Sequence, residues 1–246
     1  IFNKYQSQMK PFFSLNKNIV GESYLNKIKE IANYIKKNKS NYLFISAPEN
    51  VAWLLNIRGH DNPNSPIPNC RLLVSDTKEI FLISEKSKAR NLIKENKIKK
   101  TNLIIPENFN LFIKKLKKTK IIIDETSCSL FYENMLKKKF FILKKQDPIY
   151  FMKAIKNKLE INNMINSHVL DGVALTKFLY WIKKINKKKI NEFQAQTKLE
   201  NFRKKNKNYL YPSFNTIAGT GRNGAIVHYR ENKFNAREIK KNDIFF

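Results

Sequence analysis

The sequence predicts an α/β domain followed by helices and an unfinished sheet, and three observations support this fold class. Strand-like and helix-like patterns alternate up to residue 147, as in α/β layer domains. The pair Asp147-Pro148 interrupts this alternation, because proline restricts the residue before it. Helical spacing then dominates to about residue 205, and strand patterns return only near residue 213. We therefore expect a connector at 1–13 and domains at 14–147 and 148–246.

The first domain is expected to hold a mixed sheet with helices between its strands. Ser23 can cap a helix whose apolar residues recur at helical spacing. The turn Asp76-Thr77-Lys78 separates two apolar runs in the pattern of a hairpin. Strands are predicted at 42–46, 71–75, 79–84, 102–105, 120–124 and 140–143, and helices at 23–35, 48–55, 86–97, 108–118 and 128–138.

The second domain is expected to begin with helices and to end in strands. A helix is predicted at 149–157 and a third one at 191–205, on either side of a long helix. The long helix is indicated by spacings of 4 and 3 between Ile161, Ile165, His168, Gly172, Leu175, Leu179 and Ile182. Strands are predicted at 213–218 and 225–230.

Gly219-Thr220-Gly221-Arg222-Asn223-Gly224 has the G-x-G-x-x-G spacing of a dinucleotide site, and Asp243 lies nineteen residues after the last glycine. Such a motif binds pyrophosphate only where it opens a helix. The following residues alternate with period 2 instead, and Asn223-Gly224 is a strong hairpin signal. We expect a glycine-rich β-hairpin that presents His228, with no bound nucleotide.

The net charge of +28 makes a nucleic-acid partner worth testing, because clustered basic residues bind phosphates. Only seven of the 48 basic residues are arginine, although arginine is the preferred reader of phosphates. The 41 lysines are scattered and accompany 32 asparagines, which fits A/T-rich codon usage. We expect a solvated basic surface and no nucleic-acid partner.

Cys70 and Cys128 lie beside apolar runs and are too few for a disulfide framework, which predicts core thiols in a reducing compartment. No charged-then-apolar leader opens the chain and no apolar run has the length of a membrane span. The expected location is cytoplasmic without a membrane partner, although the chain begins with Ile1 and a preceding segment could have carried a signal.

The three histidines have different interpretations from the residues alone. His228 is either a satisfied strand residue or an active-site imidazole. His168 lies on the apolar stripe of the long helix near Asp171, which favours a structural role. His60 follows a helix and belongs either to a ligand-facing loop or to a plain turn. No zinc-spaced set, Walker loop or G-x-S-x-G motif is present.

The run from Asn50 to Asp61 (NVAWLLNIRGHD) resembles a W-L-L-N-x-R-G-x-D signature of the middle domain of three-domain aminopeptidases P. Other stretches resemble that family in the same order, namely Val20–Ser23, Lys153–Asn157 with Asp171–Ala174, and Tyr211–Arg230. The resemblance implies a creatinase-type middle domain followed by an incomplete α+β pita-bread catalytic domain, as an internal fragment of a Xaa-Pro aminopeptidase.

In that family a hydroxide between two divalent metals, usually manganese, attacks the carbonyl of an Xaa-Pro bond. The resemblance implies that His228 is an active-site histidine near the substrate carbonyl and not a metal ligand. It also implies peptide substrates with proline at the second position and a homodimer at full length.

The chain departs from the family pattern in its metal ligands. The family's D-S-G and G-T-T-D stretches, with the later His and Glu ligands, are not in this sequence, and the positions of Glu231, Glu238 and Asp243 do not match ligands. We therefore expect this chain alone to bind no metal or other cofactor and to be inactive. A non-catalytic pita-bread module that binds peptides or proteins is the alternative.

Overall fold

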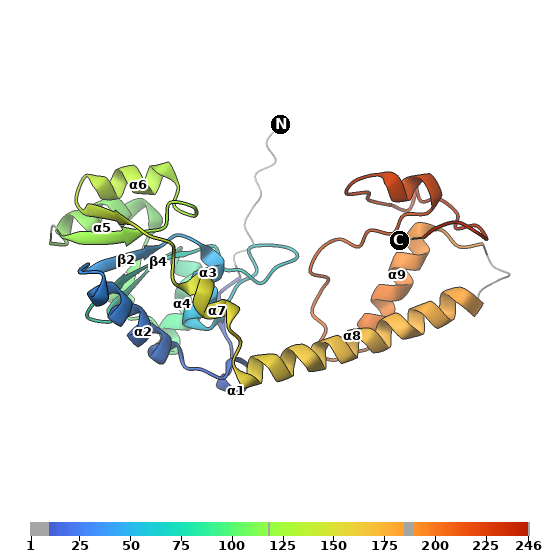
Figure 1. The fold of residues 1–246 in the computed structure, drawn as a ribbon, viewed down its shortest axis with the longest axis horizontal. Helices are drawn as coiled ribbons and strands as arrows, with labels where there is room; N and C mark the ends of the chain where they lie inside the picture. The colour runs from blue at the N-terminus through green and yellow to red at the C-terminus, as the bar shows by residue number, and fades with distance from the viewer. Residues whose placement is uncertain (1–9, 118, 185–188, 246) are drawn as a thin grey trace. The chain divides into compact units, whose positions relative to one another are not determined.

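The computed structural model describes residues 10–117, 119–184 and 189–245 (Figure 1). Most of the predicted connector, residues 1–9, and Lys118 at the end of the predicted helix 108–118 lie outside the described residues. The chain divides into two compact units, Ile1–Ile161 and Asn162–Phe246.

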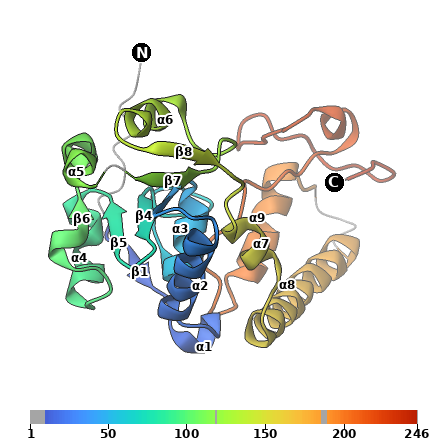
Figure 2. The same cartoon turned by 60° about the vertical axis from the view of Figure 1, so that its left-hand side comes forward.

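The first unit is built around a six-stranded mixed sheet in the order β6-β5-β4-β2-β7-β8 (Figures 1 and 2). Strand β2 pairs antiparallel with β4 and parallel with β7, and β8 extends the parallel side. The strands of both sheets are β1 (Phe13–Ser14), β2 (Tyr42–Ile45), β3 (Ile57–Arg58), β4 (Arg71–Ser75), β5 (Ile80–Ile83), β6 (Leu103–Ile104), β7 (Lys120–Ile123) and β8 (Phe141–Lys144). Strands β1 and β3 form a separate antiparallel pair.

Helices cover both faces of the six-stranded sheet. Successive strand residues point to opposite faces, and the strands carry apolar residues on both of them. Leu43 and Ile45 join a core cluster with residues of α2, α3 and α4, whereas Phe44 joins a second cluster with residues of α5 and α6. The helices of this unit are α1 (Lys17–Val20), α2 (Tyr24–Lys37), α3 (Pro48–Leu55), α4 (Lys86–Lys94), α5 (Phe109–Lys115), α6 (Leu130–Lys137) and α7 (Ile149–Ala154), with short 3₁₀ turns at Lys100–Asn102 and Pro106–Asn108.

The predicted elements of residues 14–147 are confirmed within a few residues at their ends. The Ser23 hydroxyl accepts a hydrogen bond from Asn26 N at 3.2 Å, as the predicted cap of α2. The predicted hairpin is the β4–β5 pair, and Lys78 in its turn has φ 72°. Cys70 and Cys128 are buried free thiols, as expected for core positions.

The units divide between Ile161 and Asn162, later than the boundary that the sequence predicted near residue 147. The reason is that the chain after β8 is fastened to the first unit. Buried Asp147 accepts hydrogen bonds from Asn50 Nδ2 at 2.8 Å and from Ile149 N at 2.9 Å. Lys153 Nζ donates to Asn50 Oδ1 at 2.6 Å, and Asn157 Nδ2 donates to Val20 O at 2.9 Å. Residues 148–157 thus pack with the first unit although they begin with a proline.

The second unit contains most of α8 (Lys158–Lys184), then α9 (Glu192–Arg203) and the 3₁₀ helix η3 (Gly221–Ala225). Asn191 caps α9 through a capping box with Gln194. The Asp171 carboxylate of α8 pairs with Arg203 of α9 at 2.6 Å. Among its described residues this unit holds no strand, only the isolated bridges Asn191↔Glu238 and Thr220↔Phe245.

Helix α8 confirms the predicted long helix, but few of its apolar side chains are covered. Ala174 and Phe178 are its buried residues. Large apolar side chains remain exposed at Ile161, Met164, Ile165, Val169, Leu170, Val173, Leu175, Leu179 and Tyr180. Within the described part of the chain, no helix is long and apolar enough to cross a membrane.

Lys27 of α2 is buried against the end of α3. Its ammonium donates to Trp53 O at 3.0 Å and to Asn56 Oδ1 at 2.8 Å, and it lies 3.7 Å from the centroid of the Trp53 ring. Burial lowers the pKa of Lys27 to about 8. Lysine is rarely fully buried, so its residue type gave no reason to place it in the core, although it lies four residues before buried Ile31 on the same face of α2.

The free energy of unfolding should rise with pH between about 8 and 10.5 because of Lys27. In this window the unfolded chain keeps the lysine proton, whose ordinary pKa is 10.5, while the folded chain has lost it. The Lys27→Met variant should lack this contribution, so the difference between the two proteins should change across the window. Urea unfolding followed by circular dichroism at pH 7 to 10.5 measures the free energy of unfolding of both proteins. If this free energy changed with pH equally in the two proteins, the lowered pKa of Lys27 would be contradicted.

Candidate active site

The segment around His228 is not the predicted β-hairpin. Gly221–Ala225 form the 3₁₀ helix η3, and turns continue through hydrogen bonds from Ile226 N to Asn223 O and from Tyr229 N to Ile226 O, both at 3.2 Å. The strand predictions for 213–218 and 225–230 are therefore wrong. A strand needs a partner for its backbone groups, and here nearby groups in the same loop satisfy several of them instead.

His228 lies on the surface of this segment with its side chain exposed. Its backbone has φ 55°, in the left-handed region that residues with a Cβ adopt rarely. The next residue, Tyr229, is buried. The chain therefore turns sharply between an exposed imidazole and a buried phenol.

The Glu192 carboxylate, at the first position of α9, gathers the loop that contains His228. It is fully buried and accepts hydrogen bonds from Thr220 N at 2.7 Å, Tyr229 OH at 2.7 Å and Arg237 N at 2.8 Å. Asn223 Nδ2 donates to both carboxylate oxygens, at 3.0 and 3.1 Å. Sequence reasoning missed Glu192, because its partners lie 28 to 45 residues further along the chain.

The electrostatics of this cluster favour an ionised Glu192. Burial by itself raises the pKa of Glu192, but the donors of Arg237, Thr220, Tyr229 and Asn223 outweigh it and lower the pKa. Burial and the hydrogen bond to Glu192 raise the pKa of Tyr229 to about 12. The phenol therefore stays protonated and continues to donate to the carboxylate at neutral pH.

The other carboxylates near His228 are not arranged as metal ligands. Asp243 accepts hydrogen bonds from Lys240 N and Thr220 Oγ1, both at 3.1 Å. Burial raises the pKa of Glu231, and Glu238 lies in the bridge to Asn191. Across residues 10–117, 119–184 and 189–245, no group of three or more His, Cys, Asp or Glu side chains could hold a metal ion. The residues present thus do not fit a two-metal centre.

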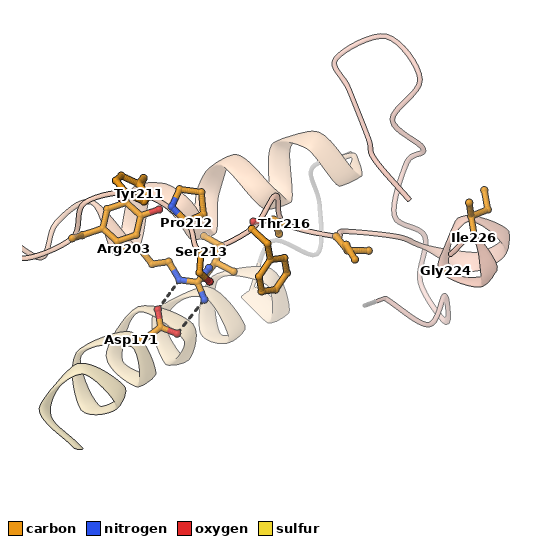
Figure 3. A pocket seen from close by; sticks show the side chains of 12 residues that line it. Asp171, Arg203, Tyr211, Pro212, Ser213, Thr216, Gly224 and Ile226 are labelled. Atoms are coloured by element: carbon orange, nitrogen blue, oxygen red, sulfur yellow. Dashed lines mark hydrogen bonds and ion pairs between the residues drawn. The ribbon is translucent and has the colours of Figure 1, made fainter. Parts of the chain in front are cut away.

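A cavity of about 750 Å³ opens within the second unit between α8, α9 and the loop after α9. Figure 3 shows the Arg203 guanidinium reaching the Asp171 carboxylate on one wall, with two hydrogen bonds at 2.6 and 3.1 Å. The rest of the lining is mostly apolar and includes Tyr211 and Ile226. Gly224 borders the cavity but His228 does not, so the predicted catalytic residue lies outside it.

In the first unit, residues of the signature run from Asn50 to Asp61 end helix α3 and make packing contacts with neighbouring elements. Asn56 ends α3 with φ 52°, and a Cβ at Gly59 would lie 2.7 Å from Pro68 Cα, so a larger residue would not fit. Buried Asp61 pairs with buried Lys88 at 2.7 Å. His60 contacts the Phe13 ring, with 5.2 Å between centroids. These contacts join β1, β3 and α4.

His168 is exposed on α8, and its Nδ1 lies 2.8 Å from Met164 O of the preceding turn. Asp171 pairs with Arg203. His168 is thus not among the hydrogen-bond partners of Glu192, and His60 belongs to the first unit.

Both parts of the chain match known families. Residues 3–160 match the Creatinase/Prolidase N-terminal domain, and residues 162–246 match Metallopeptidase family M24. The chain is 31% identical to the Xaa-Pro aminopeptidase ApepP of Drosophila melanogaster, over 86% of this chain and 35% of that protein. It is also 31% identical to Xaa-Pro aminopeptidase 1 of Dictyostelium discoideum, over 93% of this chain and 37% of that protein. The chain thus spans little more than a third of these relatives.

Solved structures share the fold. An X-prolyl aminopeptidase from Caenorhabditis elegans, described as a cytosolic enzyme with a di-nuclear active site, superposes with a TM-score of 0.84 at 22% identity. That match covers 96% of this chain and 40% of the other. The prolidase from Pyrococcus horikoshii has a TM-score of 0.64 at 22% identity, and the match covers 89% of this chain and 59% of the prolidase. These neighbours confirm the predicted fold class, a creatinase-type domain followed by part of a pita-bread domain.

The glycine-rich segment should bind no nucleotide, because η3 is a single short turn and no α-helix follows it as far as residue 245, where the described part of the chain ends. Titration with NAD or ATP, followed by calorimetry, should show no saturable binding in the micromolar range. Gly221 has φ 53°, so Gly221→Ala adds strain and serves as the local control. Saturable binding that disappears in Gly221→Ala would refute the prediction.

Proposed function

The chain belongs to the family in which a creatinase/prolidase N-terminal domain precedes an M24 metallopeptidase domain, and we propose that it is part of a Xaa-Pro aminopeptidase. The complete protein would release the N-terminal residue from peptides with proline at the second position. The observation that carries this proposal is the 31% identity to Xaa-Pro aminopeptidases over most of this chain, which extends across both domains.

His228 is the residue of this chain proposed to act on the substrate. Its imidazole would orient the substrate carbonyl or stabilise the negative charge that develops on its oxygen. Two features support this role: the side chain is exposed, and its backbone is held at a positive φ. Non-glycine residues in such conformations are found disproportionately at active sites.

The metal centre of the proposed enzyme would consist of two divalent ions, with manganese as the expected metal. The described residues do not supply its ligands, so those ligands would come from other parts of the complete protein. The M24 match and the di-nuclear active site of the C. elegans neighbour support such a centre. The contribution to the chemistry that we propose for the described residues of this chain is an imidazole placed beside the site.

The partners and location are proposed on the same basis. Peptides with proline at the second position are the expected substrates, since the relatives are named Xaa-Pro aminopeptidases. A cytoplasmic location agrees with the cytosolic C. elegans neighbour. A homodimer is proposed for the complete protein.

The 246-residue chain by itself should neither bind two catalytic metals nor hydrolyse Xaa-Pro peptides, whereas a longer form that includes an M24 domain with its ligands should do both. A two-metal site needs several carboxylate and imidazole ligands at fixed distances. Metal content by atomic spectroscopy and release of the residue before proline, with and without manganese, test both forms. Manganese-dependent hydrolysis by the 246-residue chain would refute this prediction. A longer form that binds peptide but does not hydrolyse it would favour the non-catalytic module.

In the longer form, His228→Ala should lower kcat by about 10²–10³, the usual loss for one preorganised donor. The metal content should not change, because this histidine is proposed to contact the substrate and not the metals. His168→Ala, which changes an exposed histidine outside the site, is the matched control and should keep kcat. Loss of metal in His228→Ala would show that His228 is a ligand.

A further inference from the structure

The loop that contains His228 is fastened on both sides of this residue to one carboxylate. Thr220 and Asn223 precede His228, Tyr229 and Arg237 follow it, and all four donate hydrogen bonds to Glu192. Glu192 N in turn donates to Arg237 O at 3.0 Å, so α9 holds the end of the loop through backbone and side chain together.

These partners explain why Glu192 is buried although it is a carboxylate. A buried anion is tolerated only when hydrogen bonds replace its lost hydration. Glu192 receives five such bonds from four residues, two of them from backbone N–H groups that no strand satisfies. The carboxylate and the loop therefore depend on each other: the loop supplies donors, and the carboxylate fixes where they lie.

His228 is separated from this cluster by a single peptide bond. Its imidazole is exposed and does not contact Glu192, and its φ of 55° leaves its backbone in a conformation that the surrounding structure must maintain. The nearest restraint is Tyr229, whose OH donates to Glu192 at 2.7 Å and to which Asn223 Nδ2 donates at 2.9 Å. Releasing Tyr229 from Glu192 would therefore free the His228 backbone.

We propose that Glu192 is a positioning residue for His228: its carboxylate gathers the loop from Thr220 to Arg237 and thereby sets the direction of the His228 imidazole. The structural part of this inference concerns the present chain alone. Its consequence for catalysis rests on the proposed function, in which His228 faces the substrate carbonyl.

The structural part can be tested by NMR on the 246-residue chain, because the chain contains three histidines. With histidines labelled on Cε1, single substitution of each residue assigns the three signals. Glu192→Gln keeps the shape but places an amide donor among the other donors. The His228 signal should then shift or split, while the His60 and His168 signals and the circular dichroism stay as in the wild type.

The matched control is Glu200→Gln on the same helix. Glu200 pairs with Lys204 at 2.9 Å, and the control should leave all three histidine signals unchanged. A His228 signal in folded Glu192→Gln that is identical to the wild type would overturn the proposal. If Glu192→Gln does not fold, Tyr229→Phe decides, because it removes only the phenol OH; the same signal should move by a smaller amount, and no movement would overturn the proposal.

The catalytic consequence is tested in the longer form. Glu192→Gln and Tyr229→Phe should lower kcat by about 10–100-fold, as removal of groups that orient functional residues does. KM and metal content should stay near the wild-type values, and Glu192→Asp should recover part of the loss. Adding Glu192→Gln to His228→Ala should cost little more, because Glu192 acts through His228. Full additivity of the two losses would overturn the catalytic role.

The two proposals fail in distinguishable ways. A longer wild-type form that binds its metals but cleaves no Xaa-Pro peptide would refute the proposed function, and the NMR result would still decide what Glu192 does. If the longer form is active but Glu192→Gln changes neither its kcat nor the His228 signal of the 246-residue chain, the positioning role alone is refuted.

Discussion

The first unit depends on the hydrogen-bonded pairing of strand β2 with both of its neighbours. This strand pairs antiparallel with β4 on one edge and parallel with β7 on the other. Without it, the antiparallel strands β4 and β5 would lose contact with the parallel strands β7 and β8. Its alternating side chains also supply both cores, with Leu43 on one face and Phe44 on the other. Helix α3 follows β2 directly, and its Asn50 holds Asp147, which docks the chain leaving β8.

In the second unit, buried backbone N–H and C=O groups also need hydrogen-bond partners, but they do not obtain them from a sheet. Among its described residues no strand offers a ladder of hydrogen bonds. The backbone N–H groups of Thr220 and Arg237 instead donate hydrogen bonds to the Glu192 carboxylate. A single side chain thus organises a loop of irregular structure, and this loop carries the histidine to which we assign the chemistry.

The periodic patterns predicted most of the first unit, including the cap at Ser23, the β4–β5 hairpin and the buried strand at Tyr42–Ile45. The same method failed at residues 213–230, where alternation of apolar residues indicated strands. Alternation shows only that a segment could form a strand, and it does not supply the partner. For the candidate site, the resemblance is the basis on which we propose His228, and neither Glu192 nor the buried Lys27 was predicted from the sequence.

The sequence by itself determined most helices and strands up to residue 147, the burial of β2 and the family, because these depend on neighbouring residues and on long matching motifs. Only the tertiary structure decided which strands pair beyond the β4–β5 hairpin, that Asp147 belongs inside the first unit, and how the loop around His228 is held. These outcomes depend on contacts between distant residues, such as Asn50 with Asp147 and Glu192 with Arg237, and such contacts leave no local period in the sequence.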